Sequence, residues 1–283
     1  MKNTPQKKRT IMSIIAILIG LLMAYLVPFL AQTSLERVLV HLMEHISKGN
    51  PQFQSGLKLF DFFYPVWRAM IFVAGATLLV ISQEIRKGKE WTYPLAMALF
   101  AIPSIGGMFM FLPYVSFVGG FPLPMVISWF GLAGYWSFIF LRKEEAPVKW
   151  VRFGALTLLG MLATHAFVIG VGAQRTMWTR PGYPLYPDFT WWLFLWCGEV
   201  NWIAFLLLLA AIPFLSVGKR KGWWFAVTAA VTILMINIPT QIFRTKTWDY
   251  LIGAVLASGV LIFTLVPSLK RRLLGEVSES DPG

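Results

Sequence analysis

Charged residues are scarce in this sequence. Asp, Glu, Lys and Arg make up 13% of the 283 residues, against about a quarter in soluble domains. Hydrophobic residues account for 57%, and the mean hydropathy is +0.65. A chain of this composition cannot keep its apolar surface away from water by folding on itself. We therefore expect an integral membrane protein whose surroundings are a lipid bilayer.

Cysteine and acidic residues are scarce as well. The single cysteine, Cys197, excludes an internal disulfide and a cysteine-based metal site, and we expect it to be a small buried residue. Asp and Glu number 13 against 25 Lys and Arg, which gives a net charge of +12. The basic residues form short clusters between apolar runs. This pattern is typical of loops beside anionic lipid, so we expect no nucleic-acid binding.

Familiar catalytic and metal-binding signatures are missing too. The sequence contains no G-x-S-x-G, H-E-x-x-H, D-D-x-x-D or Walker loop. His41 and His45 share one face of an expected helix, but no third ligand stands near them, so no metal site is predicted. His165 is the only histidine inside an apolar run, whereas haem held between membrane helices usually needs two axial ligands. No cofactor is identified.

Eight apolar runs are long enough to cross a bilayer, which predicts an all-α bundle. Basic clusters precede the first run and follow the second, fourth, sixth and eighth. Every second connection is thus basic, and the positive-inside rule places both termini in the cytoplasm of a cell (plasma or inner) membrane. We expect the first run to be retained as a signal anchor, because Phe29-Leu30-Ala31 is a poor cleavage site. The runs cover residues 10–31, 60–83, 92–113, 116–141, 150–173, 190–215, 223–244 and 248–269.

The connections on the other side differ in character. Residues 32–59 contain apolar side chains at helical spacing, which predicts an amphipathic helix lying on the outer membrane surface. The third and fourth runs are rich in Gly and Pro, with Gly106-Gly107, Pro113 and Gly119-Gly120, so we expect bent or re-entrant segments there. Residues 174–189 are expected to form a fixed cap. The polar tail at 276–283 is expected to be disordered.

Short stretches also recur at matching places. RKGKEW at 86–91 resembles KRKGWW at 219–224, each following an even-numbered run. We treat the chain as one transmembrane domain that contains a weak parallel repeat of four spans, with halves at 1–145 and 146–275.

The candidate site begins with Glu199, a carboxylate about 13 Å inside an apolar run by helical rise. A charged group there costs on the order of 3 kcal/mol, so a partner is expected, and Arg68 is the candidate. His165 and Asn237 fall at a similar depth in other runs. The predicted binding residues are Arg68, His165, Glu199, Asn201, Asn237, Gln241 and Arg244, and Arg175, Arg180 and Arg244 are expected to attract anions at the mouth.

These residues favour an outward-facing polar pocket that binds or transports a small solute or lipid-like molecule. A purely structural alternative is a buried Arg68–Glu199 pair that fixes helix register, with amides bonding between helices. A second alternative is the membrane-anchoring subunit of a larger complex, which holds a quinone or pigment and contacts protein partner subunits. The third is an intramembrane enzyme acting on a lipid or isoprenoid, with His165 or Glu199 as base.

Overall fold

The chain is helical throughout the part that the structure describes. A computed structural model describes residues 4–179, 188–244 and 247–276, and contains no strand within these ranges. Seven helices are long and apolar enough to cross a membrane, and an eighth qualifies if α9 and α10 count as one bent span. The all-α prediction is confirmed, and the composition of the helices fits a multi-pass membrane protein. Residues 277–283 of the predicted tail and 180–187 of the predicted cap fall outside the described residues.

The predicted apolar runs correspond to the helices in order. The helices are α1 (Gln6–Leu21), a π-helical turn (Leu22–Leu26), α2 (Val27–Ser47), a short 3-10 turn (Pro51–Phe53), α3 (Gln54–Lys87), α4 (Thr92–Phe117), α5 (Leu123–Leu141), α6 (Ala146–Thr179), α7 (Phe189–Ser216), α8 (Arg220–Phe243), α9 (Asp249–Leu265) and α10 (Pro267–Leu274).

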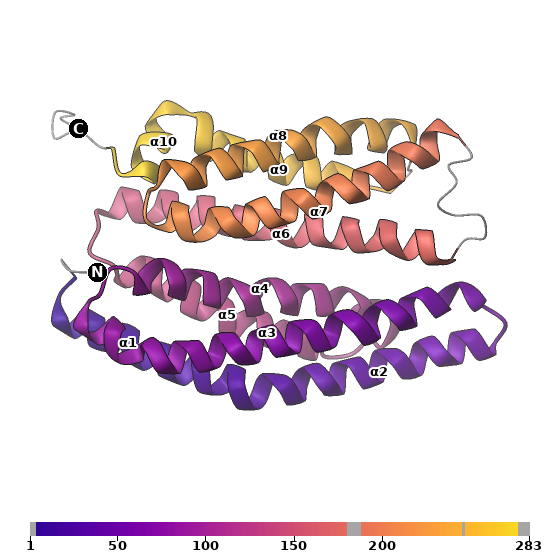
Figure 1. The fold of residues 1–283 in the computed structure, drawn as a ribbon, viewed down its shortest axis with the longest axis horizontal. Coiled ribbons are helices and arrows are strands. Elements are labelled where there is room, and N and C mark those ends of the chain that lie inside the picture. Colours follow the sequence, from indigo (N-terminus) through magenta and orange to yellow (C-terminus); the bar gives the residue numbers. More distant parts are fainter. Residues whose placement is uncertain (1–3, 180–187, 245–246, 277–283) are drawn as a thin grey trace.

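The helices form two layers (Figure 1). One layer contains α1 to α5 and the other α6 to α10, and we call these the first and second halves. Helix lengths decrease in the same order in both: 42, 34, 26 and 19 residues in the first half, and 34, 28, 24 and 17 in the second. In each half, every helix packs on its sequence neighbour, and the last packs back on the first. The predicted repeat requires such an order but remains a prediction.

The expected surface helix in residues 32–59 is wrong. α1, the π-helical turn and α2 run as one helix, Gln6–Ser47, which is longer than a membrane crossing requires. Its apolar face meets protein, because Leu35, Val38 and Leu42 are buried against the neighbouring helices. The guanidinium of Arg37 donates to the hydroxyl of Tyr114 on α4 at 2.8 Å. The amphipathic pattern of α2 therefore reflects packing against α3 and α4 rather than contact with a lipid surface.

The expected re-entrant segments are also wrong. α4 is one continuous helix that contains both Pro103 and Pro113. Its glycines serve close packing, since a Cβ at Gly107 would lie 2.6 Å from the backbone N of Ser128 on α5. Small residues at such contacts let two membrane helices approach closely. The same sequence feature, many Gly and Pro, thus marks a tight α4–α5 pair.

α9 and α10 meet at a bend of 77°. Val266 is extended, and Pro267 begins the next helix without a backbone N–H to continue α9. The eighth apolar run therefore ends at Leu265 and turns across the end of the bundle. α10 is held there by its buried Leu273.

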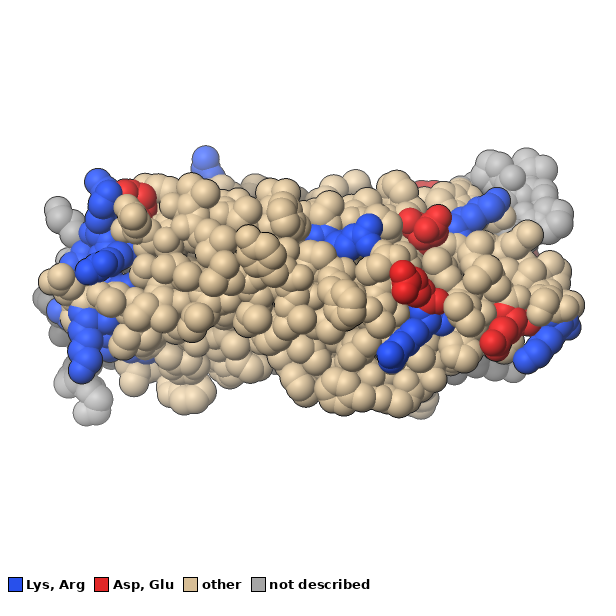
Figure 2. Space-filling model, turned by 90° about the horizontal axis from the view of Figure 1, so that it is seen from below, with Lys and Arg blue, Asp and Glu red and all other residues tan. Residues whose placement is uncertain are grey.

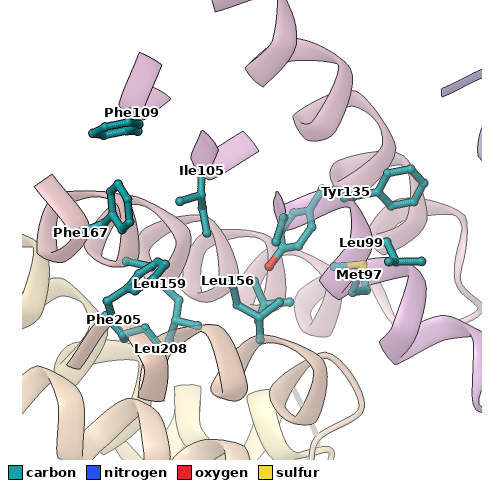
Figure 3. Close-up of a cluster of buried hydrophobic side chains, with 14 of the residues drawn as sticks. Met97, Leu99, Ile105, Phe109, Tyr135, Leu156, Leu159, Phe167, Phe205 and Leu208 are labelled. Carbon is teal, nitrogen blue, oxygen red and sulfur yellow. The ribbon is translucent and has the colours of Figure 1, made fainter. Parts of the chain in front are cut away.

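An aromatic cluster joins the two halves. Phe167 of α6 lies at its centre, with ring centroids 4.8 Å from Phe109 of α4, 5.1 Å from Trp202 and 5.0 Å from Phe205 of α7. Phe63 of α3 stacks on Trp202 at 5.8 Å. Figure 3 shows Phe109 and Phe167 facing one another, with Phe205 and Leu208 beyond them. Such ring pairs bury large areas and add about 0.5–1.5 kcal/mol each, so they fix how the halves meet here.

The two ends of the bundle differ in charge. Lys and Arg gather at the end where the described chain both begins and ends, which we call the basic end (Figure 2). A broad stretch with few charges follows, and Asp, Glu, Lys and Arg are mixed toward the opposite end, which we call the mixed-charge end. The parts of α2 and α3 nearest the turn that joins them carry charges of both signs, including Glu36, Arg37, Glu44, Lys58 and Asp61.

An ionic cluster ties the halves together at the basic end. The carboxylate of Glu144 pairs with Arg142 at 3.1 Å and with Arg152. Arg142, which follows α5, also donates to the carbonyl of Ser216 at the end of α7 at 2.8 Å. A cation at the C-terminal end of a helix is favoured by the helix dipole. Arg142, at the end of the first half, therefore binds directly to the second half.

Candidate functional site

A cavity of about 770 Å³ lies between the two halves. α4 and α5 form one wall, and α6, α9 and part of α7 form the other. Along α6 the lining runs from Leu156 to Ala173, a distance of about 25 Å by helical rise. The cavity is therefore long in the direction of the bundle axis, with α6 as its longest wall.

The wall of the cavity is mainly apolar, because most of its polar side chains already have partners. The hydroxyl of Ser104 donates to the carbonyl of Phe100 at 2.8 Å, and that of Thr164 donates to Gly160 at 3.0 Å. Trp136 donates its indole N–H to Thr157 at 3.1 Å. The donors of these three side chains are therefore already used within the wall.

Tyr135 of α5 is the exception on this wall. It is 4% exposed, and its hydroxyl has no hydrogen-bond partner among the described residues. In Figure 3 its ring points toward Leu156 of α6, across the boundary between the halves. An unpaired buried hydroxyl is costly, so Tyr135 is a candidate donor to a bound molecule.

Two glycines of α6 keep the cavity open. Gly160 and Gly172 both line it, and a Cβ added at either would meet no atom within 4 Å. Thr164 and Val168 stand between them at spacings of four residues, so this face of α6 carries small side chains. This spacing of small residues was visible in the fifth apolar run and was the signal for the cavity that sequence reasoning missed.

The cavity reaches the surface of the bundle. Leu112, Met161 and Ile252 line it and are also 40%, 50% and 50% exposed. All three are apolar and come from α4, α6 and α9. The opening is thus bordered by hydrophobic side chains rather than by charged ones.

His165 lies at the end of the cavity near α9. Its Nε2 donates to the backbone carbonyl of Asp249 at 2.7 Å, because a carbonyl can only accept. Nδ1 is then the unprotonated nitrogen of the neutral ring, and it is buried without a partner among the described residues. A Cβ at Gly253 would lie 2.8 Å from this Nδ1 and 2.4 Å from Nδ2 of Asn237. Gly253 therefore lets α9 pack directly on both polar side chains.

Asn201 and Asn237 form a buried amide pair between α7 and α8. Both are fully buried, and Nδ2 of Asn201 donates to Oδ1 of Asn237 at 2.9 Å. The same Nδ2 donates to the carbonyl of Cys197 at 2.8 Å, and the Cys197 thiol donates to Asn237 at 3.2 Å. Cys197 is buried, as predicted. Three of the predicted site residues thus lie near one another: His165 lines the cavity, and the Asn201–Asn237 pair lies outside its lining.

Gln241 and Arg244 shape the end of the second half near α9. The side chain of Gln241 accepts from the backbone N of Leu251 at 2.9 Å and donates to the carbonyl of Thr247 at 2.6 Å. The guanidinium of Arg244 lies over the rings of Trp191 at 3.9 Å and Phe194 at 5.5 Å. Phe194 also lines the cavity, so Arg244 braces the cavity wall from behind.

Arg68 and Glu199 do not meet, and the single polar pocket expected from them is not formed. Arg68 donates to Oε1 of Gln32 on α2, and Gln32 in turn donates to Glu36 at 2.8 Å. Glu199 is exposed on α7 and forms no ion pair within the described residues. Arg175 is half-buried near the end of α6, and Arg180 lies outside the described residues.

The error came from the rotation of each helix about its axis, which depth along the helix does not determine. α3 begins at Gln54 and extends past the apolar run, so Arg68 lies about 28 Å from Lys87 along the helix. α7 places Glu199 about 25 Å from Ser216. Both residues therefore lie at similar heights toward the mixed-charge end, but on different sides of the bundle. Equal depth in the sequence did not determine which face each side chain takes.

Comparison with protein-family models, with curated proteins and with solved structures finds no match to this chain.

Proposed function

We propose that this protein binds a long, mainly apolar molecule, such as a lipid or an isoprenoid, in the cavity between its halves. The observation that carries the proposal is the cavity itself, whose 770 Å³ fall within the range of about 300–1,000 Å³ typical of ligand sites. Its length along α6 and its apolar lining suit a hydrocarbon chain. A small polar solute is disfavoured, because the amides of Asn201 and Asn237 bond to one another instead of facing it.

The opening between hydrophobic residues supports entry from the bilayer. Met161 and Ile252 are each half-exposed at the rim. A lipid chain can pass such a rim without leaving an apolar surrounding, whereas a hydrated solute would lose its water there. Tyr135, with its unpaired hydroxyl, would then donate to an oxygen of the bound molecule.

We further propose that the bundle crosses a cell membrane eight times, with the basic end and both termini in the cytoplasm. The distance of about 28 Å from Lys87 to Arg68 matches a hydrocarbon layer about 30 Å thick. On this placement Arg68 and Gln32 lie at the outer boundary, where a long charged side chain reaches water at little cost. The outer parts of α2 and α3 then project beyond the membrane.

Two similar helix groups flanking one cavity also support movement of the bound molecule. Many transporters place their sites between two repeats that rock against each other. The two halves of this chain follow the same order of helix lengths and enclose the cavity between them. We therefore propose that the protein transports the lipid-like molecule that it binds.

The test fills the cavity from inside. Gly160→Phe places a ring where a Cβ meets no atom, so we expect it to fold normally and to lose the bound molecule. Val80→Phe is the matched control, because Val80 of α3 is 79% exposed and does not line the cavity. The full chain is purified in mild detergent, and co-purifying lipids are counted by native mass spectrometry. Equal lipid retention in both variants and the unmodified chain contradicts the proposal.

A further inference from the structure

A second groove lies between α6 and α7, and it contains Glu199. It has a volume of about 330 Å³ and is lined by Gly170, Ala173, Gln174, Met177, Trp178, Leu195, Gly198, Glu199 and Trp202. We propose that this groove binds an organic ammonium group, with Glu199 as counter-ion and the two tryptophans as its aromatic walls. The site is distinct from the cavity between the halves and extends what the protein binds to a cationic group.

Glycines on facing helices build the floor of the groove. A Cβ at Gly198 would lie 2.1 Å from the Cβ of Ala173, so α7 can approach α6 this closely only without a side chain there. A Cβ at Gly170 would lie 2.8 Å from the indole of Trp202. The indole therefore lies directly over the backbone of α6. Contacts with Phe63 and Phe167 hold it in that position.

The groove contains a carboxylate that has no ion-pair partner within the described residues. Glu199 is exposed and makes no ion pair with any cation in the described part of the chain. The other polar side chain of the lining is the amide of Gln174, which is neutral. A cation bound beside Glu199 would supply the counter-charge that the described residues do not.

The aromatic residues narrow the class of cation. Trp178 is 52% exposed and lines the groove, and the partly exposed Trp202 closes it beside Gly170. Indole faces attract cations, and aromatic walls are the usual receptor for quaternary ammonium groups. Met177 adds a polarizable thioether. A carboxylate alone would suit Na⁺ equally well, but the indoles favour an ammonium that carries alkyl groups.

The height of the groove indicates two sources for such a group. Glu199 lies about 25 Å from the basic end of α7, which is headgroup level on the membrane placement proposed above. The ammonium then belongs either to a phospholipid headgroup (choline or ethanolamine) or to a free amine in the outer solution. The chemistry is shared, and the experiment separates the sources.

The free-amine arm uses choline as probe. The full chain is placed in nanodiscs of phosphatidylglycerol, which has no ammonium group, and choline binding is followed by saturation-transfer NMR of its methyl protons. We expect saturable binding that Glu199→Gln and Trp178→Leu each weaken roughly tenfold. Asp61→Asn, which removes an exposed carboxylate of α3 outside the groove, should leave binding unchanged.

The lipid arm uses nanodiscs of phosphatidylethanolamine mixed with phosphatidylglycerol. Native mass spectrometry should show ethanolamine lipid retained by the unmodified chain and by Asp61→Asn, and lost from Glu199→Gln. Retention without choline binding assigns the site to lipid headgroups, whereas choline binding without lipid retention assigns it to free amines.

If the unmodified chain shows neither choline binding nor retention of ethanolamine lipid, the proposal is overturned. Equal displacement of choline by K⁺ overturns the role of the tryptophans. Gly160→Phe, which fills the separate cavity, should keep groove binding, so failure of the cavity proposal and failure of this one are distinguishable.

Discussion

Gly253 determines whether the polar residues of the second half can pack. A Cβ there would lie 2.4 Å from Nδ2 of Asn237 and 2.5 Å from the imidazole of His165. Both neighbours are held by other contacts, His165 by Asp249 and Asn237 by Asn201. Neither can move away without breaking a hydrogen bond, and the bond between the two amides is buried, which makes its loss expensive.

Gly253→Ala should therefore lower the free energy of unfolding by about 1–3 kcal/mol, the usual cost of overpacking. Gly259→Ala on the same helix is the control, because its Cβ would come no closer than 3.2 Å to a terminal methyl of Leu158, which can move. Unfolding in mixed micelles measures both. Equal stability of the two variants contradicts the tight contact described here.

Glu144 is the shared partner of two arginines at the basic end. Its side chain is 15% exposed, and that of Arg152 is only 5% exposed. Replacing the carboxylate with a neutral amide leaves two cations close together without a counter-charge.

Glu144→Gln should consequently cost about 1–3 kcal/mol of stability. The adjacent Glu145 is exposed and makes no ion pair among the described residues, so Glu145→Gln provides a control at nearly the same place. Thermal unfolding in detergent at constant pH compares the two. A destabilisation shared by both variants would indicate a general charge effect on this surface instead.

At the scale of elements, α4 and α5 are joined by backbone-to-backbone contact. At Gly107 a Cβ would lie 2.6 Å from the backbone N of Ser128 and 2.8 Å from the carbonyl of Pro124. Backbone atoms cannot turn aside as side chains can. The short connection between the two helices keeps this pair in register.

Gly107→Ala should push α4 and α5 apart and destabilise the first half. Gly172→Ala is the matched control, since it is also a helical glycine but has nothing within 4 Å of the added Cβ. Limited proteolysis of the purified chain is the measurement, with faster cleavage near residues 117–123 expected for Gly107→Ala alone. Identical cleavage patterns contradict a separation of α4 from α5.

The order and type of the elements could be read from the sequence, while their ends and contacts could not. The hydrophobic runs predicted the position of each helix along the chain, because a helix that crosses a bilayer needs a long apolar segment. The runs missed the ends of α2, α3 and α6, since polar side chains there interrupt the apolar pattern. Gly and Pro in α4 were misread because the same residues break helices in water and pack them in lipid.

For the candidate site, too, the sequence predicted positions along the helices but not the contacts between them. Depth along each helix placed Arg68, His165, Glu199 and Asn237 at similar heights, and this followed from helical rise alone. Which of them meet depends on the rotation of each helix about its axis. That rotation is set by contacts such as Gly253 on Asn237, which no single-sequence pattern encodes.

For the whole molecule, the charge difference between the two ends predicts its orientation. Because Cys197 is buried, a thiol reagent should label the unmodified chain only weakly. We expect Lys48→Cys, after α2, to react in intact cells with a membrane-impermeant maleimide, and Lys89→Cys, after α3, to react only once the membrane is opened. The two sites lie at opposite ends of α3. Reversed accessibility would invert the proposed topology.

Ala173 lines both the cavity between the halves and the groove that contains Glu199. One helix, α6, therefore separates the two proposed binding places, and a displacement of α6 by an occupant on one side would change the space on the other. Thermodynamic linkage makes such an influence mutual: whatever factor a hydrocarbon chain applies to ammonium affinity, the ammonium must apply to the chain. Measuring the affinity for one ligand with and without the other bound would therefore give the coupling between the two places that share Ala173.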